Sequence, residues 1–109
     1  MKRTALISAA AAVAALALPA VAKDYEAGKK KVQEVCVACH GEDGNQGMTP
    51  DTPRLGGQYY DYLVHSLEQY RKGKRQNPLM TPMAQPLTDE DISNLAYYFS
   101  RQKGLTVKY

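Results

Sequence analysis

Apolar and polar residues follow two different patterns, and the first ends near residue 22. Residues 5–18 form an almost unbroken apolar run after Lys2 and Arg3, and Ala20-Val21-Ala22 comes soon after it. A basic start, a short apolar run and an Ala-x-Ala ending are typical of a signal peptide. We therefore expect residues 1–22 to be a cleaved signal peptide, residues 23–109 to form one mature domain, and that domain to lie in the periplasm.

An uncleaved membrane anchor is the alternative interpretation of residues 1–22. The apolar run is shorter than the roughly 20 residues that a membrane-spanning helix needs, and Pro19 interrupts it. No second run of this kind follows Ala22, so we expect no membrane span in the mature chain.

The mature chain changes to an amphipathic pattern, which first predicts a helix from about Asp24 to Val37. Asp24 is a suitable N-cap, and Glu26 in the first turn favours the helix dipole. Helical spacing places four residues on one face, namely Tyr25, Gly28, Val32 and Val35.

A second helix is predicted from about Gln58 to Lys72, with Gly73 as its stop. His65 lies off the apolar stripe of this helix, so we expect it to be exposed to solvent and not to ligate a metal. The stripe consists of Tyr59, Tyr62, Leu63, Leu67 and Tyr70.

The third helix has the clearest start, because Thr88 with the acidic residues 89–91 resembles a capping box. Leu87 and Ile92 are spaced for a hydrophobic staple, and Gly104 is the expected end. Its apolar face is Ile92, Leu95, Ala96 and Phe99. No strand-like alternation of useful length lies between the helices, so the predicted fold class is all-α.

The connecting segments, residues 41–57 and 73–86, are rich in Gly, Pro, Asn and Thr. Unstructured loops longer than about 12–15 residues are usually functional in a compact domain. We expect Pro78, Pro82 and Pro86 to keep the second segment extended and stiff. A mature domain of 87 residues is also small enough to need a staple or a cofactor for its core.

The net charge of the mature chain limits the kinds of partner that it can bind. The mature residues carry twelve Lys and Arg against eleven Asp and Glu. Nucleic-acid binding calls for a large basic surplus, so we expect no nucleic-acid partner. The basic residues cluster at 29–31 and at 71–75. Such clusters can steer a protein towards acidic partners, but the faces of helices that are exposed to water carry similar clusters without any partner.

Both cysteines belong to one motif, Cys36-Val37-Ala38-Cys39-His40, which is the attachment signature of c-type haem. The two thiols add to the two vinyl groups of haem, and the adjacent imidazole of His40 reaches the iron from the same side. We therefore expect one covalently bound haem c per chain, attached at Cys36 and Cys39 with His40 as an axial iron ligand.

Two other interpretations of the cysteine pair are weaker. A thioredoxin-like redox site belongs in a βαβ unit, and no strand is predicted before Cys36. A structural zinc site usually takes four Cys or His ligands, and only His65 remains outside the motif.

The sixth iron ligand decides what a haem protein does. The options in this chain are a Lys, no ligand at all, His65, Met48, Met80 or Met83. A thioether raises the reduction potential and suits an electron carrier. Met48 follows His40 too closely to reach the opposite haem face, whereas Met80 and Met83 lie in a long segment with ample reach; we expect one of the pair to ligate and the other to pack.

The mature chain resembles class I cytochromes c, in particular the small bacterial monohaem type and single domains of dihaem cytochromes. The resemblance rests on the haem motif together with Asp43-Gly44-Asn45, residues 53–58, Met80-Thr81-Pro82-Met83-Ala84 and residues 87–99. It implies three main helices, with long loops wrapped around the haem. The first and last helices would cross where Gly28 permits close approach.

The resemblance also implies roles for single residues. It selects Met80 over Met83 as the axial ligand and leaves Met83 in the haem pocket. It assigns the carbonyl of Pro53 to the ring N–H of His40, an outer bond of the kind that fixes the tautomer of a ligand. Leu55 would pack on the haem face.

These observations predict a periplasmic single-electron carrier with His/Met axial ligation rather than an enzyme, since neither axial position would be open. Its partners would be a protein donor and a protein acceptor, and we expect a monomer. A haem subunit of a periplasmic dehydrogenase or oxidase complex is the first alternative. A gas-binding or catalytic haem protein with an open sixth position is the second.

Overall fold

The computed structural model describes residues 4–12 and 23–104 of the chain. Residues 4–12 are exposed and form neither helix nor strand. Lys2, Arg3 and the expected cleavage site at residues 20–22 lie outside the described residues, so the signal peptide stays a prediction. None of the helices in the described part of the chain has the length and apolar composition that crossing a bilayer requires.

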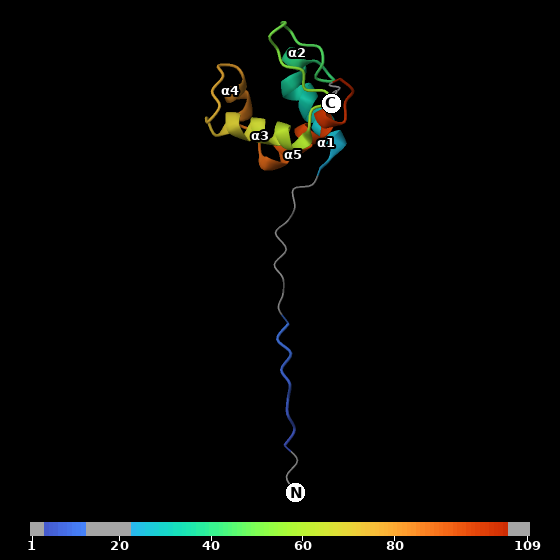
Figure 1. Ribbon diagram of the computed structural model, residues 1–109, viewed down its shortest axis with the longest axis vertical. Helices are drawn as coiled ribbons and strands as arrows, with labels where there is room; N and C mark the ends of the chain where they lie inside the picture. Colours follow the sequence, from blue (N-terminus) through green and yellow to red (C-terminus); the bar gives the residue numbers. More distant parts are fainter. Residues whose placement is uncertain (1–3, 13–22, 105–109) are drawn as a thin grey trace, which may run out of the picture.

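Residues 23–104 are helical and contain no strand, as expected for an all-α domain. In Figure 1, α3 and α5 lie at the base of the folded part, and α2 and α4 stand above them on opposite sides. The elements in chain order are α1 (Tyr25–Lys31), the π-helical η1 (Val32–Cys36), α2 (Val37–His40), α3 (Tyr60–Arg71), α4 (Met80–Ala84) and α5 (Asp89–Ser100).

The packing of α1 against α5 is the largest helix contact, and Gly28 makes it possible. A Cβ atom at Gly28 would run into the backbone carbonyl of Asn94 and would lie 3.0 Å from Cβ of Tyr98. A side-chain hydrogen bond adds to this contact, because Oδ1 of Asn94 accepts from the backbone N–H of Asp24 at 2.9 Å. The crossing of the first and last helices at Gly28 is therefore confirmed.

Both predicted N-caps are present. Oδ1 of Asp24 accepts from the N–H of Ala27, and Thr88 forms a complete capping box with Asp91. Each cap satisfies backbone donors that the first turn of a helix leaves unpaired. One end differs from expectation: α5 stops at Ser100, four residues before Gly104.

The core lies where α5 meets α1 and α3. Ile92, Leu95 and Val32 are the largest side chains withdrawn from solvent almost completely. The buried apolar set is Val32, Leu63, Ala84, Leu87, Ile92, Leu95, Ala96, Tyr98 and Phe99.

The buried face of α3 differs from the predicted stripe. Tyr59 and Tyr62 are 59% and 51% exposed, so their assignment to the core face was wrong. The helix begins at Tyr60, and the side chains that reach the core follow the i, i+3, i+4, i+7 spacing from there. These are Tyr60, Leu63, Val64 and Leu67, followed by Tyr70.

The first helical stretch is longer and less regular than predicted. The expected α-helix from Asp24 to Val37 gives way at Val32 to a π-helical turn that ends at Cys36, and α2 then continues to His40. Short π-helical turns are rare and frequently occur at functional sites. Here the turn ends on the first cysteine of the haem motif.

The three prolines of the segment before α5 suggested an extended chain. The structure differs, because part of this segment is helical. Met80–Ala84 forms the short helix α4, which packs against α3. Pro82 is compatible with this helix because it lies in its first turn, where a missing backbone N–H breaks no internal bond.

Candidate haem site

His40 ends α2 and is buried, with 7% of its surface exposed. Its Nδ1 lies 3.1 Å from the backbone carbonyl oxygen of Pro53, so Nδ1 is the protonated nitrogen that donates this bond. Burial lowers the pKa of the imidazole below its ordinary value, although the bond to Pro53 acts in the opposite direction. The ring is therefore held neutral, and Nε2 keeps its lone pair with no hydrogen bond to any described residue.

The chain reverses direction directly after His40. Gly41 adopts a φ of +81°, and the carbonyl of His40 then accepts from the N–H of Gln46 at 3.1 Å. A second bond, from the N–H of Met48 to the carbonyl of Cys39, closes the same turn at 2.9 Å. The side chain of Met48 is 64% exposed, in keeping with its dismissal as an iron ligand.

The two cysteines are free thiols at the start and end of one helical turn. Cys36 is half-buried and Cys39 is exposed. Burial raises the pKa of the Cys36 thiol to about 12, and nearby Lys31 opposes that rise only in part. Thiols of dithiol redox enzymes have a lowered pKa instead, so the environment of Cys36 argues against a thioredoxin-like site.

The two candidate methionines differ in their exposure to solvent. Met80 begins α4 and is half-buried, whereas Met83 is 44% exposed. Residues three apart on a helix lie on neighbouring parts of one face, so helical spacing alone does not separate the two. Met80 is thus the more buried of the two methionines, and the choice between them stays a prediction.

The residues present fit a covalently attached haem. Two free thiols, a neutral imidazole with an available Nε2 and a half-buried thioether are the donors that such a group requires. A set of apolar side chains also packs on the core with one side still exposed, as a hydrophobic cofactor needs. This set is Cys36, Leu55, Tyr60, Val64, Leu67 and Tyr70.

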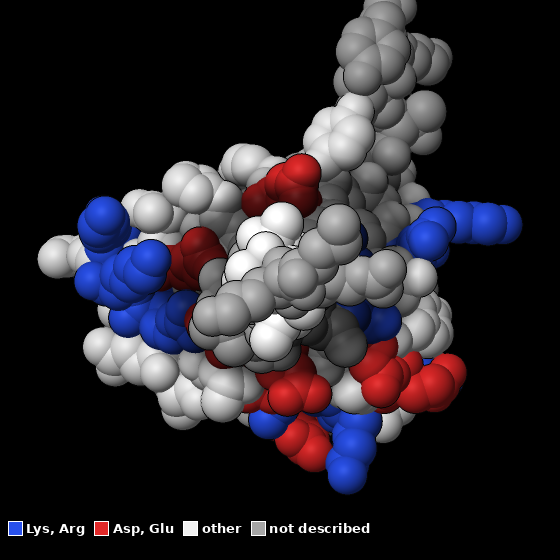
Figure 2. All heavy atoms as spheres, turned by 90° about the horizontal axis from the view of Figure 1, so that it is seen from below, with Lys and Arg blue, Asp and Glu red and all other residues white. Residues whose placement is uncertain are grey.

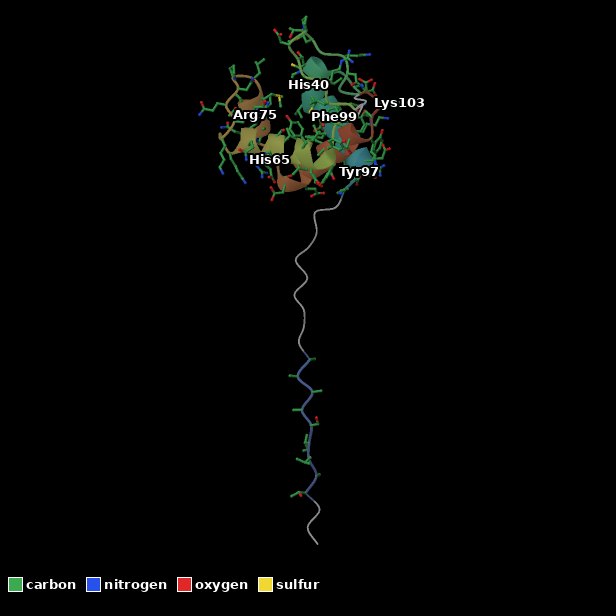
Figure 3. All side chains as sticks on the ribbon, viewed as in Figure 1. His40, His65, Arg75, Tyr97, Phe99 and Lys103 are labelled. Carbon is green, nitrogen blue, oxygen red and sulfur yellow. The ribbon has the colours of Figure 1, made fainter. Side chains whose placement is uncertain are left out.

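A zinc site has no support in the described residues, where no three His, Cys, Asp or Glu side chains come together as a metal cluster. His65 is exposed on α3, as predicted. Figure 3 shows it well apart from His40.

The sequence analysis missed two contacts that hold this site. The hydroxyl of Tyr98 donates to the backbone carbonyl of Glu42 at 2.7 Å, which ties the loop after His40 to α5. Asn77 accepts from the backbone N–H groups of Leu79 and Met80. The second contact had a signal in the sequence, because Asn followed by Pro is a common start of a helix.

The chain is similar to known proteins in sequence and in fold. A family model described as "Cytochrome c" matches residues 25–103. "Cytochrome c-554(548)" of Halomonas halodenitrificans is 51% identical over 85 residues, which are 75% of this chain and 100% of that protein.

The chain also resembles larger proteins over part of their length. The crystal structure of reduced cytochrome c4 from Pseudomonas stutzeri superposes with a TM-score of 0.69 at 43% identity, covering 77% of this chain and 48% of that one. The "Thiosulfate dehydrogenase electron acceptor" of Thiomonas intermedia is 38% identical over 62% of this chain and 31% of that protein. The chain thus spans half or less of these two relatives.

Cytochromes c transfer electrons through covalently bound haem c, and Cys36, Cys39 and His40 supply the attachment motif for it. The family model covers nearly all of residues 23–104, and one relative is matched over its whole length. The chain belongs to the cytochrome c family.

Proposed function

We propose that this cytochrome c is a periplasmic single-electron carrier whose iron is ligated by His40 and Met80. The observation that carries the proposal is the placement of His40, which is buried and donates from Nδ1 to the carbonyl of Pro53. Nε2 has no hydrogen-bond partner among the described residues, so it is available to bind iron.

Each residue of the site has a separate task. Cys36 and Cys39 would hold the cofactor covalently through thioether bonds. Pro53 keeps the proton on Nδ1, which fixes the tautomer of His40 and raises its basicity as a ligand. Leu55 and the half-exposed apolar residues of α3 exclude water from the cofactor surface. When bound, haem c supplies a one-electron ferric/ferrous couple.

Met80 makes this haem site suitable for electron transfer and not for binding a substrate. A thioether ligand stabilises ferrous iron and raises the potential, and it closes the sixth position to substrates. Electron transfer then needs no bond making at the metal and only brief contact with a donor and an acceptor. A monomer is sufficient for this task.

The charges of the surface support an acidic protein partner. Figure 2 shows a group of basic side chains along the left edge of the face viewed, on the side where Arg75 lies in Figure 3, and further basic side chains at its right edge and bottom. Lys72 and Lys74 are exposed at the end of α3. Each basic cluster has one member that already pairs with carboxylates, namely Lys31 with Glu34 and Asp91, and Arg71 with Asp89. The exposed Lys72 and Lys74 are therefore the residues of the α3 cluster that we propose for steering.

Two matched substitutions on α4 test the ligation. Met80→Ala should abolish the weak red absorption band that a thioether bond to ferric iron produces, lower the reduction potential and allow the reduced protein to bind CO. Met83→Ala should leave all three properties unchanged. The reverse pattern would assign the ligand to Met83, and unchanged spectra in both variants would remove methionine ligation altogether.

A second candidate function is a haem subunit of a periplasmic dehydrogenase. The similarity to a thiosulfate dehydrogenase electron acceptor favours it, and so does the superposition on a thiosulfate dehydrogenase of Marichromatium purpuratum with a TM-score of 0.68 at 28% identity. The site chemistry would be the same, with a permanent partner. Purification of the chromosomally expressed protein at low salt distinguishes the two: a lone haem protein of about 10 kDa indicates a free carrier, and a stoichiometric larger complex indicates a subunit.

A further inference from the structure

The backbone just before Met80 is held by one side chain. Oδ1 of Asn77 accepts from the N–H of Leu79 and from the N–H of Met80, both at 2.9 Å. Pro78, which lies between Asn77 and Leu79, has no N–H to satisfy. One amide oxygen therefore fixes the turn from which the Met80 side chain leaves the backbone.

Thr81 holds the backbone on the other side of Met80. Its Oγ1 accepts from the N–H of Asn77 at 2.9 Å and donates to the carbonyl of Arg75 at 3.2 Å. Its own N–H donates to the carbonyl of Asn77 at 3.0 Å. Asn77 and Thr81 thus bond to each other across Met80 and enclose it in a closed set of hydrogen bonds.

Packing gives the residues directly before Met80 little support. Residues 76–79 are all exposed, and Ala84 is the buried residue of α4. A helix of five residues is also far shorter than the roughly 12–15 residues that isolated helices need for marginal stability in water. The hydrogen bonds of Asn77 and Thr81 are consequently a large share of what fixes the direction of the Met80 side chain.

We propose that Asn77 and Thr81 are positioning residues for Met80, which keep its thioether directed into the haem site and so strengthen the sixth iron ligand. The inference rests on the proposed function, since it takes Met80 as that ligand. It goes beyond that function by naming what strengthens the bond between Met80 and the iron. This support comes from the turn before α4 and not from the haem motif.

The proposal can be measured as a competition between the Met80 thioether and an added ligand for the sixth position of the iron. When the turn is loosened, the thioether leaves the iron more often, and an added ligand such as imidazole binds more tightly. Loss of the backbone bonds that one such side chain makes costs about 1 kcal/mol, as for a capping residue or a typical internal hydrogen bond, and this equals roughly five-fold in an equilibrium. We expect the affinity of the ferric protein for imidazole to increase by about that factor in Asn77→Ala and in Thr81→Val.

Conservative variants separate positioning from mere folding. Asn77→Asp and Thr81→Ser keep the accepting oxygen, so their imidazole affinity should stay within about two-fold of the wild type. The readouts are imidazole titration of the ferric holoprotein, the intensity of the red thioether band and the reduction potential, with haem attachment checked by mass. If Asn77→Ala does not retain haem, Thr81→Val, which removes a single hydroxyl, carries the test.

The outcomes distinguish this inference from the proposed function. Tighter imidazole binding in Asn77→Ala and Thr81→Val, with affinity near that of the wild type in Asn77→Asp and Thr81→Ser, would support the positioning role. A normal red band in the wild type with unchanged imidazole affinity in Asn77→Ala and Thr81→Val would overturn it, even if both variants melt at lower temperature. Absence of the red band from the wild type would overturn the ligation by Met80 itself.

Discussion

The hydroxyl of Tyr98 donates a 2.7 Å hydrogen bond to the backbone carbonyl of Glu42, two residues after His40. Tyr98 lies on α5 and is only 3% exposed, and its ring packs against Tyr25 and Phe99. The last helix is thereby joined directly to the loop that leaves the haem motif. A substitution far from Cys36 and Cys39 in the sequence should consequently affect this loop.

Tyr98→Phe removes the hydroxyl and keeps the ring. Since a typical internal hydrogen bond contributes about 0.5–1.5 kcal/mol, we expect a loss of that size in the free energy of unfolding near neutral pH, measured with urea on the holoprotein. Tyr97→Phe is the matched control, because its hydroxyl accepts a 3.3 Å bond from Arg101 at the surface. Equal losses in the two variants would contradict a special role of Tyr98.

The same pair predicts a dependence on pH. Burial raises the pKa of Tyr98, with smaller contributions from Tyr25, Glu42 and Asp43. A raised pKa means that the folded state keeps this proton up to a higher pH than the unfolded state does. The stabilisation is therefore complete below the unfolded value of about 10 and is lost as the pH rises through the folded value. Unfolding free energies above pH 10 should fall less steeply in Tyr98→Phe than in the wild type.

Gly28→Ala tests the close approach of α1 and α5. Alanine favours a helix over glycine by about 1 kcal/mol, but its Cβ would collide with the carbonyl of Asn94. Because overpacking typically costs about 1–3 kcal/mol, we expect a net loss of stability by urea unfolding. Lys30→Ala, an exposed change on the same helix, should be close to neutral. A stabilised Gly28→Ala variant would contradict the observed crossing.

Arg71 joins the end of α3 to the start of α5. It donates to the carbonyl of Leu87 at 3.1 Å and pairs with Asp89 at 2.6 Å. Asp89→Asn removes the exposed ion pair and one acidic charge from the first turn of α5, and should cost about 1 kcal/mol. Arg71→Ala also removes the bond to Leu87 and should cost about 2 kcal/mol. Urea unfolding of both, with Lys72→Ala as a neutral control, checks this order; a larger loss in Asp89→Asn would reverse the interpretation.

The apoprotein should be largely unfolded. The apolar side chains around Leu55 and along α3 stay half-exposed until the cofactor covers them, and a domain this small has little other apolar surface to bury. The double variant with Cys36→Ala and Cys39→Ala should therefore lose most of its helical circular dichroism. Ala38→Ser, between the two cysteines, should load haem and fold normally. Strong helical dichroism in the double variant would contradict the structural role of the cofactor.

The parts of the fold that the sequence predicted correctly are governed by local chemistry. The caps at Asp24 and Thr88 depend on residues within three positions of each other, so their patterns can be read directly. The haem motif is equally local. Gly28 was assigned through a family resemblance, and its contact with Asn94 across the fold explains why a glycine is required there.

The errors have tertiary or competing causes. Tyr59 and Tyr62 fitted an apolar stripe, but the start of α3 at Tyr60 turned both to solvent. Three prolines suggested an extended segment at residues 78–86, whereas Asn77 with Pro78 at the next position starts a helical turn that leads into α4. The π-helical turn at residues 32–36 had no signal in the spacing of apolar residues, and the contacts of the described residues give no physical account of it.

The central claim, a single-electron carrier with a thioether at its sixth iron position, is tested most directly by optical redox titration of the wild-type holoprotein. The account predicts one transition that fits a one-electron Nernst curve, a red thioether band that disappears on reduction, and no rapid CO binding by the reduced form. A ferric spectrum without that band, together with fast CO binding, would contradict the account and indicate an open sixth position.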